Sequence, residues 1–166
     1  NNGHLYYEYK KLSNFENFKN SDLNIKLQQT SDNNYIKKND IYSEINNDLN
    51  FLENSINLNL YSDNYSLKFN SSIFEDLNKN KNDKYEYIIP QIDLFWDIEN
   101  KTNLDGDLSL ETNNLVRNYD TNVYEKSNIN NLNFLSTSKI SRSGILNDYQ
   151  LQIKNTNTDS QNSSTF

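Results

Sequence analysis

The chain contains 166 residues, carries a formal net charge of −7 and lacks cysteine. The acidic balance argues against nucleic acid, because a nucleic-acid-binding surface must be basic to displace the counterions of the phosphates. Without cysteine the chain forms no disulfide or thiolate metal site, and none of its apolar runs approaches the roughly 20 residues of a transmembrane helix.

Asparagine dominates the composition, with 34 residues, whereas alanine is absent. Helices are therefore disfavoured, because asparagine and serine compete for backbone hydrogen bonds and the best helix former is missing. Such a composition is also typical of disordered low-complexity tracts. The 12 tyrosines and 8 phenylalanines oppose that alternative, since disordered chains are poor in aromatic residues.

A strict alternation of apolar and polar residues recurs along the chain. It is clearest in Ser55–Tyr61, Tyr65–Asn70, Gln91–Ile98 and Tyr149–Lys154. A period of two predicts strands that present one apolar and one polar face.

The alternation predicts eight strands joined by turns. In chain order they cover residues 5–10, 22–30, 52–62, 65–75, 85–98, 107–116, 121–135 and 145–156. Residues 31–50 are predicted to form a long loop. Asp63 and Asn64 are predicted to form a tight hairpin turn, since both residue types tolerate positive φ.

Two positions interrupt the pattern. Pro90 lies inside the fifth predicted strand and cannot donate to a sheet ladder, which indicates an edge, a bulge or a strand start. In the seventh strand the alternation slips between Ile129 and Leu132. One extra residue at Asn130–Asn131 is the expected cause, as a β-bulge.

The fold class follows as all-β, an antiparallel meander. Two architectures would cover the apolar face and hydrate the polar one. One is a soluble sandwich with a second layer, and the other is a large transmembrane β-barrel with lipid outside and water inside. Strands near 10 residues favour the barrel. On this hypothesis the predicted lumen-facing residues are Asn57, Asn59, Lys68, Asp93, Gln150 and Lys154, and the predicted lipid-facing residues are Ile56, Leu58, Leu67, Phe69, Ile92, Leu94, Leu151 and Ile153.

Three motifs, in the same order and spacing, resemble the barrel of the LptD family (also called OstA or Imp) of lipopolysaccharide (LPS) assembly proteins. Lys84–Leu94 is similar to its RYE-x-x-P-x-I-x-L segment. Tyr119–Leu132 resembles the YDTN-x-x-E-x-x-x-INDL pattern of the alphaproteobacterial branch. Leu151–Asn157, with Asn162–Ser164 after it, resembles the strand end that follows. The chain has Lys84 and Asn131 where the patterns have arginine and aspartate.

The resemblance implies a transporter that is not an enzyme and uses no cofactor. It implies a place in the bacterial outer membrane, where the barrel delivers LPS to the outer leaflet. The implied partners are LPS, membrane lipid, an LptE-type plug lipoprotein and a periplasmic LPS bridge. Residues 1–166 are expected to form one partial barrel domain, a fragment without the family's N-terminal periplasmic domain and the C-terminal end of the barrel.

Other candidate sites are weaker. His4 is the single histidine and lies near one end of the chain, where solvent exposure is expected. Four acidic residues surround one predicted turn, namely Asp97, Glu99, Asp105 and Asp107. They lack the distal bidentate glutamate of an EF-hand, so a turn is favoured over a calcium loop. Arg117 and Arg142 are expected near strand ends, as loop charges or as phosphate ligands.

A soluble secreted β-rich adhesin or binding module remains the alternative function. It requires a second apolar layer over the sheet, whereas a barrel requires none. A disordered segment predicts no strands.

Overall fold

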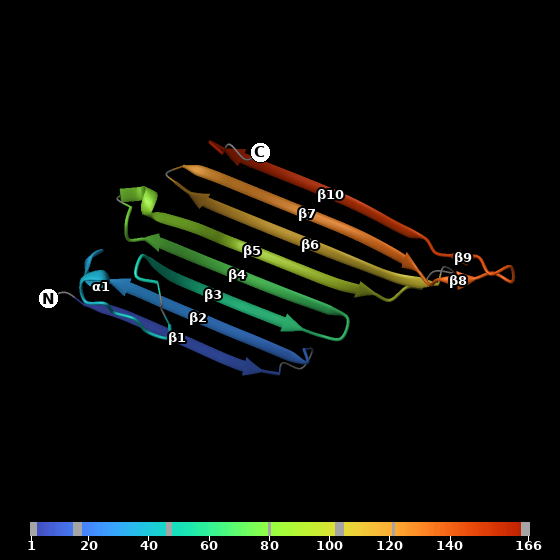
Figure 1. The fold of residues 1–166 in the computed structure, drawn as a ribbon, viewed down its shortest axis with the longest axis horizontal. Coiled ribbons are helices and arrows are strands. Elements are labelled where there is room, and N and C mark those ends of the chain that lie inside the picture. The colour runs from blue at the N-terminus through green and yellow to red at the C-terminus, as the bar shows by residue number, and fades with distance from the viewer. Residues whose placement is uncertain are drawn as a thin grey trace.

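The computed structural model describes residues 3–14, 18–45, 48–79, 81–101, 105–120 and 122–163, leaving out the side chains of residues 81 and 82. Eight long strands form one antiparallel sheet in the order β1-β2-β3-β4-β5-β6-β7-β10 (Figure 1). Every long strand therefore pairs with the next one along the chain, which confirms the predicted all-β meander. Their bounds are β1 His4–Ser13, β2 Asn20–Thr30, β3 Phe51–Tyr61, β4 Tyr65–Asp76, β5 Tyr85–Ile98, β6 Gly106–Tyr119, β7 Val123–Ser136 and β10 Gln150–Gln161.

Short elements cap the two ends of the sheet. The helix end carries α1 (Tyr35–Lys38), η1 (Lys81–Lys84) and the β6–β7 turn. The hairpin end carries a small separate hairpin of β8 (Lys139–Ile140) and β9 (Leu146–Asn147). The last predicted strand was therefore placed too early, because residues 145–149 belong to the β8–β9 hairpin and its exit.

The tight turns follow local chemistry. Asp63 and Asn64 join β3 to β4 as predicted, and the Ser62 N–H closes that turn on the Tyr65 carbonyl at 2.8 Å. At the β6–β7 turn, Asp120 and Asn122 have φ of 40° and 74°. Aspartate and asparagine accept this left-handed conformation at low cost, so a short connection suffices.

Pro90 lies in the central strand β5, where it forms a bulge rather than an edge. The register of β5 shifts against β4 between Asn70 and Ser72, and against β6 between Ile88 and Gln91. The bulge accommodates the missing N–H and confirms one of the predicted outcomes.

The bulge predicted at Asn130–Asn131 is wrong. β7 pairs continuously with both β6 and β10 through these residues. The slip has another cause: Ile129 points to the face opposite Leu132, while Asn130 takes a position that an apolar residue holds elsewhere. The interruption is therefore a local change in composition on an unbroken strand.

Residues directly opposite in an antiparallel ladder point to the same face, so the register divides the sheet into two faces. Across β2–β5 one row joins Leu23, Leu58, Phe69 and Ile92. The next row, which points the other way, joins Asp22, Asn59, Lys68 and Asp93. The faces that contain these rows are called the apolar face and the polar face below.

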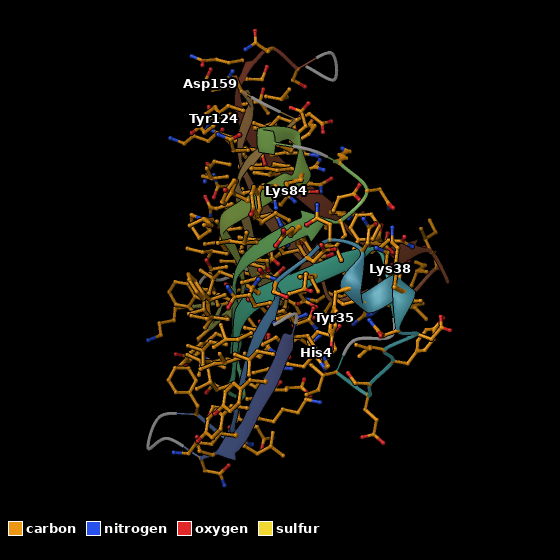
Figure 2. All side chains as sticks on the ribbon, turned by 90° about the vertical axis from the view of Figure 1, so that its left-hand side faces the viewer. His4, Tyr35, Lys38, Lys84, Tyr124 and Asp159 are labelled. Carbon is orange, nitrogen blue, oxygen red and sulfur yellow. The ribbon has the colours of Figure 1, made fainter. Side chains whose placement is uncertain are left out.

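A small core lies at the helix end. Among the described residues, the buried hydrophobic side chains are Ile36 of α1, Leu52 of β3 and Leu77 after β4. Figure 2 shows α1, with Tyr35 and Lys38, on one side of the sheet near His4. Within the described chain, no second layer covers the apolar face, and none of the helices is long and apolar enough to cross a membrane.

Gln28 fixes the loop that carries α1. The β2–β3 ladder stops at the Lys26–Ser55 pair, and the Gln28 side chain enters the gap. Its Oε1 accepts from the Glu53 N–H at 2.7 Å, and its Nε2 donates to the Ile45 carbonyl at 3.1 Å. These side-chain bonds replace the missing ladder and attach the loop to the sheet.

Candidate functional site

The structure separates the two predicted sets of site residues. The six predicted lumen-facing residues share the polar face, and the eight predicted lipid-facing residues share the apolar face. The distant strand β10 obeys the same division, since Lys154 lies opposite Asn131 and Ile153 opposite Leu132. The register settles which residues share a face, and contact with lipid or water stays a prediction.

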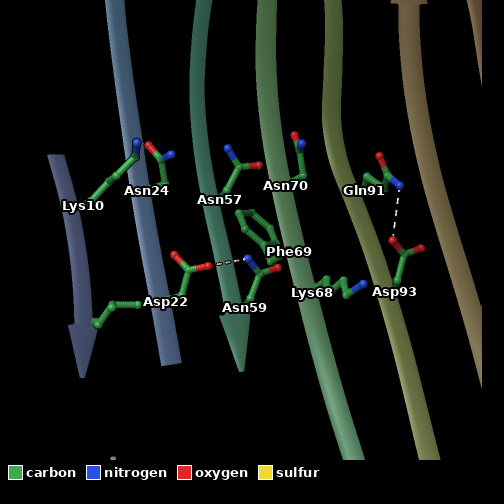
Figure 3. A pocket seen from close by; sticks show the side chains of 11 residues that line it. Lys10, Asp22, Asn24, Asn57, Asn59, Lys68, Phe69, Asn70, Gln91 and Asp93 are labelled. Carbon is green, nitrogen blue, oxygen red and sulfur yellow. Dashed lines mark hydrogen bonds between the residues drawn. The ribbon is translucent and has the colours of Figure 1, made fainter. Parts of the chain in front are cut away.

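The polar face is hollowed over β1–β5. A cavity of about 600 Å³ opens there (Figure 3). Four predicted lumen-facing residues line it, whereas Gln150 and Lys154 lie on β10, away from it. Phe69, which was predicted to face lipid and whose register places it on the apolar face, also borders the cavity. Sequence reasoning missed Asp22, Asn24, Asn70 and Gln91, although each alternates with apolar neighbours. The full lining is Lys10, Leu12, Asp22, Asn24, Asn57, Asn59, Lys68, Phe69, Asn70, Gln91 and Asp93.

Side-chain amides hold the carboxylates of this cavity. Asn59 Nδ2 donates to Asp22 Oδ2 at 3.0 Å, and Gln91 Nε2 donates to Asp93 Oδ2 at 3.2 Å (Figure 3). Asn113, from β6, donates to the other oxygen of Asp93. The cavity thus combines acceptor oxygens with amide N–H groups. The ammonium group of Lys68 is exposed beside them and forms no ion pair with any residue that the structure describes. Such a surface suits a hydrated, hydroxyl-rich ligand.

A second polar cluster lies at the helix end of the sheet, near the β6–β7 turn. Arg117 lies on β6, and its Nε is 2.7 Å from Glu86 Oε1 and its Nη1 is 3.8 Å from Glu125 Oε2. Glu125 is only 7% exposed and also accepts from the Tyr119 hydroxyl at 2.9 Å. Arg117 is therefore a strand residue engaged by two carboxylates, which corrects its expected place in a loop.

Lysines reinforce the same end. Lys84 Nζ is 2.6 Å from Glu75 Oε1, and this hydrogen bond raises the pKa of Lys84 above its ordinary value. Lys79 Nζ is 2.8 Å from Asp120 Oδ1, and that hydrogen bond likewise raises the pKa of Lys79. Both lysines therefore keep their charge at neutral pH. Lys84 links η1 to β4, and Lys79 links the β4–β5 connection to the β6–β7 turn.

The remaining candidates, His4 and the acidic residues near Asp105, make contacts with neighbouring side chains. The His4 ring lies 4.9 Å from the Tyr6 ring and 5.9 Å from the Tyr35 ring. Asp105 pairs with Lys139 at 2.6 Å, and this hydrogen bond lowers the pKa of Asp105. Residues 102–104, in the turn predicted between Glu99 and Asp105, lie outside the described residues. Within the part of the chain that is described, no three histidine or acidic side chains come together as metal ligands.

Comparison with known families agrees with this architecture. The family model described as LptD, LPS transport system D, matches residues 4–165. The match covers all eight long strands and both faces. Comparisons with curated proteins and with solved structures found no match.

Proposed function

Because the chain belongs to the LptD family of LPS transport proteins, we propose that its sheet is a section of an outer-membrane β-barrel. In this arrangement the apolar face contacts lipid, and the polar face lines the aqueous lumen. The barrel delivers LPS to the outer leaflet, and no covalent bond of the substrate is made or broken.

The proposal rests on the slant of the apolar band, which is the run of apolar side chains that crosses the apolar face from β1 to β10. On β3 the apolar side chains of that face, apart from Leu52 in the small core, centre on Leu58. The row of Leu58 reaches Lys11 on β1 and Asn157 on β10. On β1, however, the apolar residues centre on Tyr7, four residues from Lys11 toward the helix end. On β10 the apolar residues are Leu151 and Ile153. Their midpoint is position 152, five residues from Asn157 toward the hairpin end.

The band therefore shifts by nine residues over seven strand-to-strand steps, about 1.3 residues per step. With a rise of about 3.3 Å per residue and about 4.8 Å between strands, it runs about 40° from the perpendicular to the strands. A lipid belt of constant height requires this slant when strands tilt, and transmembrane barrel strands tilt by about 35–45°.

The exposure of the apolar face supports the same arrangement. Ile56 is 46% exposed, and Leu151 and Ile153 are 57% and 55% exposed. A continuous apolar surface of this kind is unfavourable in water and marks contact with another molecule or a membrane. Lipid covers it without the second protein layer that the adhesin alternative needs.

The polar face supplies the complementary surface. Its amides and carboxylates offer donors and acceptors to the sugar head group of LPS, and they remain hydrated in a wet lumen. The acyl chains leave through a lateral opening of the barrel. By family resemblance, an LptE-type lipoprotein plugs the lumen and a periplasmic bridge supplies the LPS.

Photo-crosslinking in the intact parent protein tests this function in its own cells. A photoreactive amino acid at Asn59 is expected to form an LPS adduct that disappears when LPS synthesis is stopped, because the LPS there is in transit. The same group at Leu58 reports lipid that resides in the membrane, so its adducts persist. An Asn59 position that never captures LPS, together with normal surface LPS after depletion of the protein, contradicts the proposal.

A further inference from the structure

The β8–β9 hairpin at the hairpin end exposes large apolar side chains. Ile140 is 74% exposed and Ile145 60%, and the neighbouring Leu146 and Tyr149 are as open. Ile140 and Leu146 lie directly opposite each other in the hairpin and share one side of it. A soluble loop normally carries polar residues at such positions, so this surface calls for a partner.

The apolar band leads toward this hairpin. On β6, β7 and β10 the helix-end half of the apolar face is polar, because amides form ladders there. Thr112 Oγ1 donates to Asn130 Oδ1 at 3.0 Å, and Asn130 Nδ2 donates to Asn128 Oδ1 at 2.6 Å. Apart from Val116 and Tyr124, the apolar residues of that face on these strands lie in the hairpin-end half, as Leu108, Leu110, Leu132, Phe134, Leu151 and Ile153.

The hairpin adjoins that half of the face directly. A cleft of about 480 Å³ lies between them, lined by Phe134 and Ser136 of β7 and by Lys139 and Asn147 of the hairpin. Tyr149, which also lines the cleft, is tied to β7 because the Ser136 N–H donates to its carbonyl at 2.8 Å. The exposed apolar side chains therefore extend the band past the strand ends.

The charge of the hairpin is opposite to that of the chain. Residues 126–147 form the longest stretch without aspartate or glutamate in a chain of net charge −7. Within it Lys139 is paired with Asp105, whereas Arg142, at the hairpin turn, makes no ion pair with any described residue. An exposed guanidinium beside apolar side chains complements the phosphate of a lipid head group.

We propose that the β8–β9 hairpin is a membrane-interface anchor that binds the anionic head groups of phospholipids in the surrounding bilayer. Ile140, Ile145 and Leu146 enter the boundary between head groups and acyl chains, and Arg142 contacts phosphate. This inference rests on the proposed barrel and adds a specific lipid contact to it.

Spin labels on the intact protein in lipid nanodiscs test the anchor. Ile145→Cys carries the label in the hairpin, and Asn64→Cys carries it in the polar β3–β4 turn at the same end of the sheet. In discs that contain phosphatidylglycerol, the label at 145 is expected to collide more with oxygen and less with a water-soluble nickel chelate than the label at 64. Arg142→Gln is expected to shift the label at 145 toward the chelate. Pure phosphatidylcholine discs are expected to do the same, because phosphatidylcholine keeps the phosphate but has no net negative charge.

A label at Leu151→Cys separates the two proposals. If position 151 contacts lipid while position 145 matches the water-exposed position 64, the anchor is wrong and the barrel stands. If position 151 is also in water, the barrel itself is wrong. Lipid contact at position 145 that neither Arg142→Gln nor the change of lipid alters overturns the role of the anionic head group.

Discussion

Replacing Leu58 with arginine is expected to destabilise the membrane-inserted protein by about 2–4 kcal/mol, the cost of arginine near the bilayer midplane on the lipid face of a barrel. Leu58 is the centre of the apolar band on β3 and lies between Leu23 and Phe69 in its row. A charge there must be buried in hydrocarbon or pull the strand toward the interface. Reversible unfolding of the intact protein from lipid vesicles measures the free energy, and the heat-shifted gel band reports the folded fraction.

Asn59→Arg is the matched control for that substitution. Residue 59 is the next residue on the same strand, but its side chain lies on the polar face beside Asp22. A wet lumen hydrates the new guanidinium, so the expected change is below about 1 kcal/mol. An equal loss of stability from Leu58→Arg and Asn59→Arg would show that the two faces lie in the same environment. That result would contradict the proposed barrel, in which one face contacts lipid and the other contacts water.

Leu52→Ala is expected to lower the free energy of unfolding by about 2–5 kcal/mol, since a buried leucine leaves a cavity that its surroundings fill only in part. Leu52 is fully buried against Ile36 and Leu77, where few other apolar side chains are buried. The loss should also release α1, because Ile36 is the buried residue of that helix. Denaturant unfolding and protease cleavage between β2 and β3 measure the two effects.

Leu12→Ala provides the comparison for Leu52→Ala. Leu12 is 83% exposed on the edge strand β1, so its truncation is expected to change stability by less than about 0.5 kcal/mol. If Leu52→Ala is equally mild and the loop stays resistant to protease, the small core at the helix end does not hold the loop.

Local patterns made most strands predictable. The boundaries of β5 and the Asp63–Asn64 turn follow from alternation and turn chemistry, which act between near neighbours. Other features depend on contacts between distant segments. β9 was assigned to the last predicted strand, which was begun at residue 145, and β8 lay outside any predicted strand. The helix α1 has little helix propensity of its own and is stabilised by Leu52 and Leu77.

The same distinction applies to the candidate site. A period of two is enough to assign side chains to opposite faces, so both predicted sets were sorted consistently. It does not reveal the cross-strand register that brings Asp22 to Asn59, or Asn113 to Asp93. The cavity on the polar face therefore became visible only in the structure.

The asparagine content, which first left a disordered tract as an alternative, has a structural place in the sheet. Asn59 and Asn113 hold carboxylates on the polar face. On the other face Asn128 donates to Asn114, which lies opposite it on β6, and accepts from Asn130 on its own strand. Amides opposite each other on paired strands satisfy one another, which lets a strand remain regular where the apolar pattern is lost.

The most direct test of the barrel is a spin-label scan along residues 56–60 of β3 in the intact protein, reconstituted into a bilayer. The account predicts strict alternation, with positions 56, 58 and 60 accessible to oxygen in lipid and positions 57 and 59 accessible to a nickel chelate in water. Uniform access of the chelate to all five positions would contradict it and favour the soluble β-rich module.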